Sequence, residues 1–246
     1  MELDLIALAT DPGSGLSPKA ALRWGVHLLD PTQPLEPQYR ELLKRYDRVL
    51  SLHASAKLCP VGSQAREAAN AADPLRIRVV DTGLGSAGLG AAVQRAGELL
   101  RQGLSEEAIL AELDRMRKEG RFLLTTADLS TLAKNRMIPP LGERFGEALG
   151  LWALFTLEHG AFRFLPLPIP ARRVPEALAS TLQRHFSKKR VRVRVLLGNV
   201  PSEYRSRLKD RLEKTLNLAA GTLAPMDPLA KSRVGKEAIA VFAYPV

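Results

Sequence analysis

Residues able to do chemistry gather between positions 51 and 59, where the sequence reads SLHASAKLC. The hydroxyl of Ser55 and the thiol of Cys59 are candidate nucleophiles, and the His53 imidazole is a candidate general base. A hydrolase would need His53 within hydrogen-bond reach of one nucleophile, and a third group to orient the ring. No spacing identifies such a partner. The sequence therefore favours a core or hydrogen-bonded histidine and a small buried cysteine over catalysis.

Other motifs predict neither a metal nor a cofactor. The four histidines lack the spacing of metal ligands, and a single cysteine excludes a multi-cysteine zinc site or an internal disulfide. The glycines of TDPGSGL at 10–16 could let backbone N–H groups approach an anion, but they do not form a nucleotide fingerprint, and no GxxxxGK[ST] motif is present. We therefore predict no catalytic residue, no metal site and no cofactor.

Composition bounds the partners. The chain has 246 residues, of which 46% are apolar, enough to bury the core of one large or two modest domains. Its 36 basic and 26 acidic residues give a net charge of +10, which attracts anions. Aromatics make up only 5%, which argues against single-stranded nucleic acid. No apolar run reaches the length of a membrane span, and the N-terminus begins acidic, so we expect a cytoplasmic protein.

The first half of the chain alternates short apolar strands with helices. We predict strands at 3–9, 26–30, 48–54 and 77–81. Helix-like patterns cover residues 18–25, 36–46, 62–72, 86–103 and 105–120. This alternation predicts an α/β domain with a mainly parallel sheet flanked by helices. In such sheets, ligands bind beyond the carboxyl ends of the strands.

The second half predicts a mixed sheet with helices. A hairpin signal, Glu158-His159-Gly160, joins two apolar runs, and RVRVRVLLG at 190–198 alternates Arg with Val as a strand with one basic face would. Further strands are expected at 122–128 and 237–246, and amphipathic helices at 174–186 and 204–216. We place two α/β domains at 1–121 and 122–246.

Five short segments carry a family resemblance. They are TDPGSGL at 10–16, PTQPL at 31–35, HASAKLCP at 53–60, DTGLGSAGLG at 81–90 and TLAKNRMI at 131–138. In this order they resemble the motifs TDS-(S/T)-x-D-L, TSQPS, SSKLSGTYQSA, DS-x-x-S-x-GLG and YL-x-x-GGRI of the DegV family, which comprises bacterial lipid-binding proteins. The resemblance extends over nearly the full length of the chain.

The resemblance implies a fatty-acid-binding protein. It implies a long-chain fatty acid between two α/β domains, with the acyl chain in an apolar tunnel and the carboxylate held by hydroxyls and basic groups. Carried over by position, the carboxylate contacts are Ser55, Thr32, Arg136 and Arg233, and the loop residues near the ligand are Thr10, Asp11, Ser14, Ala56 and Ser86. Pro31 stands in place of the family's threonine, and Pro60 removes a backbone donor.

Two functions therefore compete. The first is a non-enzymatic carrier of a fatty acid, which some family members present to a separate fatty-acid kinase. The alternative is a degenerate family member that docks an acidic protein or nucleic acid through a basic C-terminal face with Arg190, Arg192 and Arg194. A solvated exterior surface is the commoner explanation for such basic runs. The sequence favours the carrier.

Overall fold

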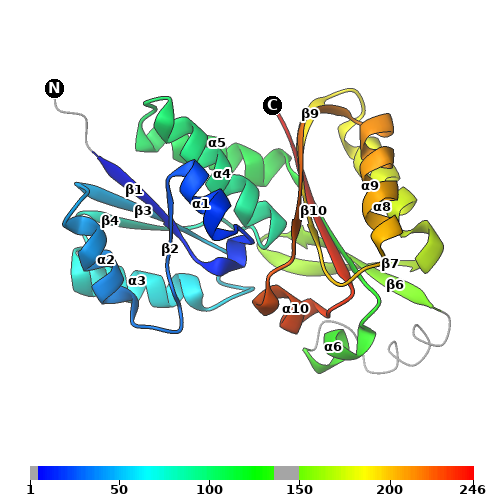
Figure 1. Ribbon diagram of the computed structural model, residues 1–246, viewed down its shortest axis with the longest axis horizontal. Helices are drawn as coiled ribbons and strands as arrows, with labels where there is room; N and C mark the ends of the chain where they lie inside the picture. The colour runs from blue at the N-terminus through cyan, green and yellow to red at the C-terminus, as the bar shows by residue number, and fades with distance from the viewer. Residues whose placement is uncertain (1–4, 136–149) are drawn as a thin grey trace. The chain divides into compact units, whose positions relative to one another are not determined.

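The computed structural model describes residues 5–135 and 150–246, the side chains of residues 166 and 167 excepted. The chain divides into two compact units, Met1–Lys118 and Glu119–Val246, called unit 1 and unit 2 (Figure 1). The boundary predicted near residue 121 lies beside this division. No described helix has both the length and the apolarity that crossing a membrane requires.

Unit 1 is built on a four-stranded sheet in which every neighbouring pair is parallel, in the order β2-β1-β3-β4. The strands are β1 (Ile6–Thr10), β2 (Val26–Leu28), β3 (Arg48–His53) and β4 (Ile77–Asp81). The central strands β1 and β3 are buried almost throughout, as expected of parallel strands covered on both faces. The mainly parallel α/β sheet predicted from the sequence is confirmed.

Helices cover both faces of this sheet. They are α1 (Pro18–Trp24), α2 (Leu35–Leu43), α3 (Val61–Ala72), α4 (Ala87–Arg101) and α5 (Glu106–Glu119). In Figure 1, α2 and α3 lie on one side of the strands, and α4 and α5 lie on the other. Tyr39 of α2 and Ala65 of α3 are fully buried in a cluster with Val49 of β3 and Ala9 of β1.

Unit 2 is built on a six-stranded mixed sheet in the order β7-β6-β5-β10-β8-β9. The strands are β5 (Arg121–Thr126), β6 (Leu151–Glu158), β7 (Ala161–Pro170), β8 (Arg190–Leu197), β9 (Asn217–Pro225) and β10 (Ala238–Pro245). Only the β8–β9 pair is parallel. The predicted hairpin is confirmed, because His159 and Gly160 join β6 to β7 with φ angles of 49° and 76°.

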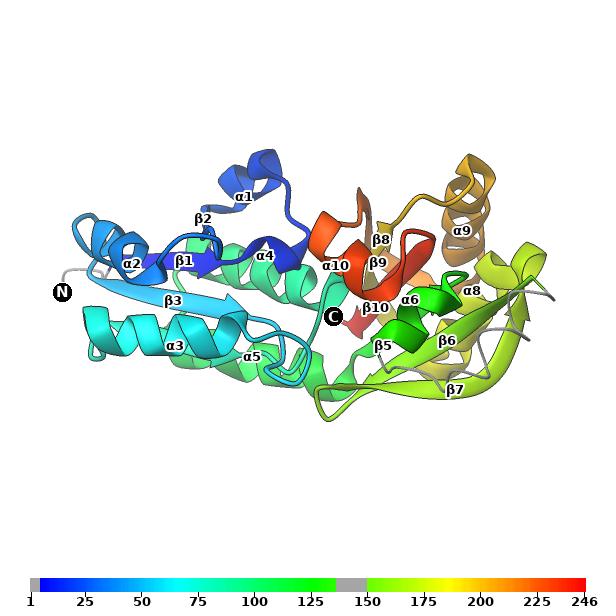
Figure 2. The same ribbon diagram turned by 90° about the horizontal axis from the view of Figure 1, so that it is seen from below.

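Two helices cover one face of the six-stranded sheet. Among the described residues of unit 2, the helical elements are α6 (Leu129–Lys134), the 3-10 turn η2 (Ala171–Arg173), α8 (Val174–Phe186), α9 (Ser202–Thr215) and α10 (Pro228–Val234). Figure 2 shows α8 and α9 beside the sheet strands. Leu182 of α8 and Leu208 of α9 pack into one core with Val193 and Val241 of the sheet.

The alternation of Arg and Val in β8 produces a less basic face than expected. Val191, Val193 and Val195 lie in the core beneath the helices, as predicted. Arg190 is exposed, but Arg194 is only 6% exposed. Burial lowers the pKa of Arg194 to about 10. The alternative function, docking through the arginines of this strand, therefore loses one of its three contacts.

Candidate functional site

The loop after β1 is tied down by its own aspartate. Asp11 caps the 3-10 turn η1 (Pro12–Ser14), and its Oδ1 accepts a hydrogen bond of 2.8 Å from the N–H of Gly13. The turn packs against α4, the helix that follows β4. The side chain of Asp11 is almost fully buried. The loop after β1, which lies at the carboxyl edge of the parallel sheet, is therefore held against the helix that follows β4.

The loop after β3 is joined to the same edge through Ser55. The Ser55 N–H donates to the carbonyl of Leu84 at 2.8 Å, which links the loops after β3 and β4. Its carbonyl accepts from the N–H groups of Leu58 and Cys59 at 2.8 and 3.0 Å, turning the chain toward α3. Ala56 donates its N–H to Asp81 Oδ2 at 3.1 Å.

Three serine hydroxyls in these loops have unused hydrogen-bonding capacity. Ser14 and Ser55 are 0% and 3% exposed, and each oxygen accepts only a long bond, of 3.4 Å from Leu16 N–H and 3.3 Å from Lys57 N–H. The buried oxygen of Ser86, at the start of α4, has no hydrogen-bond partner among the described residues. Since buried polar groups are normally satisfied, these hydroxyls suit a polar ligand.

The two threonines of the same edge serve the fold. Thr10 donates its hydroxyl hydrogen to the carbonyl of Leu52 at 2.7 Å, and Thr82 donates to the carbonyl of His53 at 2.8 Å. Both side chains thereby fasten neighbouring strand ends to one another. Thr10, which the resemblance places near the ligand, is fully buried and already engaged.

Beneath this edge lies a buried chain of four hydrogen-bonded side chains. Tyr39 donates to Ser51 Oγ at 2.8 Å, Ser51 Oγ lies 2.8 Å from His53 Nε2, and His53 Nδ1 lies 2.7 Å from Asp11 Oδ2. With Nδ1 donating to the Asp11 carboxylate, Ser51 donates to Nε2, and every donor in the chain has an acceptor. The prediction of a core or hydrogen-bonded histidine is confirmed, since His53 is both buried and hydrogen-bonded.

These hydrogen-bonded side chains include the residue types of a serine–histidine–aspartate triad, but a substrate has no access to them. Ser51 and His53 are each 0% exposed, so no substrate reaches that serine. Both ring nitrogens of His53 are engaged, and neither bonds Ser55 or Cys59. Cys59 is half-buried, not fully buried as the sequence suggested. The described geometry does not form the hydrolase constellation considered from the sequence.

Tyr39 makes the stability of this hydrogen-bonded network depend on pH in alkaline solution. Burial, together with the nearby Asp11 charge, raises the pKa of Tyr39 from 10.0 to about 12. The unfolded chain ionises at the lower value, so the stability that Tyr39 contributes is complete below pH 10 and is lost as the pH rises toward 12.

We expect the free energy of unfolding to fall over this range by up to about 2–3 kcal/mol more in the wild type than in a Tyr39→Phe variant. Urea denaturation at a series of alkaline pH values measures the difference. The phenylalanine variant keeps the ring but has no ionisable hydroxyl, so lysine and arginine titration is common to both proteins. Parallel curves for the two would contradict the assignment.

In unit 2, side-chain hydrogen bonds organise the segment around α6 and α10. Asp128 caps α6, accepting hydrogen bonds of 3.0 Å from Thr131 N–H and from the Ser130 hydroxyl. Asn135 Nδ2 donates to the carbonyl of Arg233 at 2.7 Å, which ties the end of α6 to α10. The side chain of Arg233 is exposed.

The predicted carboxylate contacts fall in different surroundings. Ser55 lies in unit 1 with a hydroxyl hydrogen to spare. Thr32 is exposed, and its hydroxyl donates to Asp30 Oδ1 at 2.7 Å. Arg233 lies on α10 of unit 2, and Arg136 lies outside the described residues. Among the loop residues, Ala56 is exposed while Asp11 and Ser14 are buried.

Sequence reasoning missed two features of this edge. One is the buried chain that starts at Tyr39. The other is GLGSAG at 83–88, which has the spacing GxGxxG between β4 and α4. That spacing marks dinucleotide sites when a further parallel strand follows the helix. Here α4 is followed by α5, and β4 is the edge strand, so the required βαβ unit is not formed.

Within residues 5–135 and 150–246, no three His, Cys, Asp or Glu residues could hold a metal ion.

Comparison with solved structures finds close relatives of this fold. A DegV family protein from Thermus thermophilus, whose structure is described as showing fatty acid binding, has a TM-score of 0.85 and 26% identity, covering 98% of this chain and 100% of that one. A DegV family protein from Corynebacterium glutamicum has a TM-score of 0.86 and 19% identity, covering 99% and 98%.

Sequence comparison leads to the same family. A DegV domain-containing protein of Deinococcus radiodurans is 34% identical over 122 residues, which is 50% of this chain and 43% of that protein. The chain thus matches less than half the length of this relative. The protein-family model described as "Uncharacterised protein, DegV family" matches residues 31–246 of this chain. The chain belongs to the DegV family.

Proposed function

We propose that this protein is a carrier for a long-chain fatty acid. The observation that carries the proposal is its likeness, at 26% identity over nearly the whole of both chains, to the Thermus thermophilus protein described by its fatty acid binding. The unused, buried hydroxyl of Ser55 supports it, because a carboxylate buried away from water needs hydrogen-bond donors to offset its desolvation.

We assign the carboxylate to Ser55, Thr32, Arg136 and Arg233. A serine hydroxyl and two guanidinium groups would together supply charge-assisted hydrogen bonds, which are stronger than neutral ones. Thr32 would have to exchange its bond to Asp30 for the ligand, so we expect it to contribute least. Ser14 and Ser86, whose hydroxyls have no acceptor among the described residues, are further donors at the same edge of unit 1.

The proposed carrier performs no covalent chemistry of its own. The full engagement of the His53 ring supports this view, because the obvious base near Ser55 and Cys59 is already committed to Asp11 and Ser51. We further propose that the protein works in the cytoplasm and presents its bound fatty acid to a separate fatty-acid kinase, as the family resemblance implies.

Mass spectrometry tests the proposal. Purified protein, analysed first native and then denatured, is expected to release a fatty acid, and delipidated protein is expected to take up palmitate or oleate. Ser55→Ala should weaken palmitate binding about tenfold or more, since it removes a hydrogen bond to a charged group. Ser63→Ala, the same change at an exposed position of α3, is the matched control and should bind as the wild type does. A lipid-free protein that takes up neither acid would refute the carrier.

A further inference from the structure

The two edges of the six-stranded sheet are protected differently. The β7 edge carries Pro168 and Pro170, which have no N–H to donate, and Arg163, ion-paired with Glu158 at 2.6 Å. Prolines and charges of this kind prevent edge strands from pairing with other chains. The β9 edge, NLAAGTLAP, has no charged residue, and its one proline is the last residue. Within the described ranges, β9 pairs only with β8.

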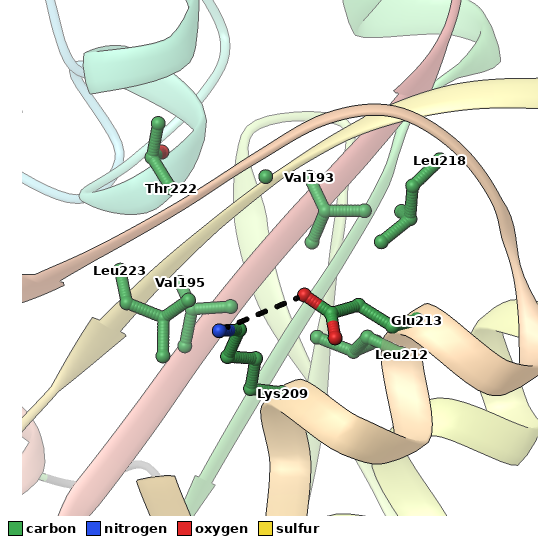
Figure 3. A pocket seen from close by; sticks show the side chains of 9 residues that line it. Val193, Val195, Lys209, Leu212, Glu213, Leu218, Thr222 and Leu223 are labelled. Atoms are coloured by element: carbon green, nitrogen blue, oxygen red, sulfur yellow. Dashed lines mark ion pairs between the residues drawn. The ribbon is translucent and has the colours of Figure 1, made fainter. Parts of the chain in front are cut away.

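A cavity of about 220 Å³ lies between β9, β8 and α9 (Figure 3). Its walls are mainly apolar, with Val193 and Val195 from β8, Leu212 from α9, and Leu218 and Leu223 from β9. Gly221 also lines it, and no heavy atom lies within 4 Å of where a Cβ on that residue would stand. The space is suited to an apolar side chain arriving at the sheet edge.

The charge of unit 2 indicates what kind of partner chain would bind at this edge. Unit 2 holds 21 of the 36 basic residues and 11 of the 26 acidic ones, so it carries the whole net charge of +10. Exposed cations flank β9: Arg190 is the register partner of Asn217, Lys214 precedes the strand, and Lys209 lines the cavity. The Lys209 ammonium is 3.9 Å from Glu213, a loose ion pair that an incoming anion can replace.

We propose that β9 is the docking edge for an extended, acidic segment of a partner protein. The segment adds to the sheet as a further strand beside β9, and one of its apolar side chains enters the cavity at Gly221. Main-chain hydrogen bonds supply affinity, and the cavity and the cations supply specificity. A second copy of this chain is a poorer partner, because pairing β9 with β9 would bring together two units that each carry +10.

A labelled synthetic peptide of nine residues, the length of β9, tests this docking. Its centre alternates leucine and threonine, and glutamates stand at both ends. We expect fluorescence anisotropy to show saturable binding that weakens with salt. Two control peptides, one with lysines replacing the glutamates and one with N-methylated central amides, should not bind. Equal binding of either control would overturn the proposal, as would no binding of the acidic peptide.

Variants locate the binding. Gly221→Phe fills the cavity and should weaken binding about tenfold or more, whereas Gly221→Ala leaves most of the space and should bind nearly as the wild type. Lys209→Glu should weaken binding at low salt only, and Lys44→Glu, the same charge change at the exposed residue that follows α2 in unit 1, should have no effect. Unchanged affinity in both Gly221→Phe and Lys209→Glu would overturn the proposal. So would light scattering that shows the protein alone to be a dimer that Gly221→Phe dissociates.

Discussion

A His53→Ala variant is expected to lose about 3–5 kcal/mol of its free energy of unfolding, because the Asp11 carboxylate stays buried without the N–H that His53 donates to it, and the lost ring leaves a cavity in the core. The buried Asp11 carboxylate would lose the hydrogen bond to its Oδ2. The Ser51 hydroxyl would lose its acceptor, the Nε2 atom of His53. The loop capped by Asp11 would also lose its connection to β3. Urea denaturation followed by Trp24 fluorescence measures the loss within unit 1.

Two comparisons make this result specific. His27→Ala removes another histidine from the same sheet, one whose ring, among the described residues, hydrogen-bonds only the Tyr46 hydroxyl, at 3.0 Å, and we expect it to cost about 1 kcal/mol. A double variant, Asp11→Ala with His53→Ala, should be destabilised by clearly less than the sum of the single changes, because the two groups act on each other. Additive effects, or a His53→Ala loss no larger than that of His27→Ala, would mean that the buried pair contributes little.

A Gly235→Ala variant is the second large effect we expect. Gly235 has a φ of 97°, which costs any other residue about 1–3 kcal/mol. An added Cβ would also clash with the Cβ of Asp128, so one of the two backbones would have to move. Moving Asp128 breaks the cap of α6, worth about another 1 kcal/mol. We expect a total loss of at least about 3 kcal/mol, measured by chemical denaturation followed by Trp152 fluorescence.

Gly221→Ala is the matched control for this change. It places the same methyl group in unit 2, at a position with ordinary φ and no neighbouring atom within 4 Å. Its stability should equal or slightly exceed that of the wild type, because alanine restricts the unfolded chain more than glycine does. If both alanine variants lost the same stability, the strain and contact assigned to Gly235 would be wrong.

The architecture of unit 1 could be predicted because its signals are local. The strand predicted at 77–81 is β4, and the strand predicted at 48–54 ends one residue later than β3. Apolar runs bounded by turn residues need no knowledge of their partners. Ligands bind beyond the carboxyl ends of parallel strands, and this rule places Asp11, Ser14 and Ser55 at the carboxyl edge of the sheet in unit 1.

Unit 2 contains what the sequence does not predict. The segment NLAAGTLAP is rich in alanine and glycine, which have low strand propensity, and it becomes β9 because β8 offers it a pairing partner. Similarly, Arg194 is buried by the surrounding structure although a strand with alternating Arg and Val favours an exposed basic face. Such outcomes are decided by tertiary packing, which a local pattern does not contain.

The candidate site likewise has a part that the sequence predicts and a part that it does not. Its serines follow strand ends and are visible in the sequence. The bond between His53 and Asp11 joins residues 42 positions apart, and Tyr39 reaches Ser51 from a helix. No spacing rule marks such pairs, because Asp11 meets His53 only when β1 pairs with β3, and Tyr39 meets Ser51 only when α2 packs on the sheet. The hydrogen-bonding state of each hydroxyl is likewise a property of the folded chain.

The central position of β10 has a consequence for biosynthesis. β10 lies between β5 and β8, and all eight of its residues are buried, yet it is translated after the other five strands of its sheet. At ribosomal speeds, β5 waits on the order of ten seconds for this neighbour. During that interval the edge of β5 that pairs with β10 is unpaired, and so is the facing edge of β8 once β8 has been translated, while all four strands of unit 1 have already been made. Nascent chains are therefore expected to need a holding chaperone until β10 leaves the ribosome.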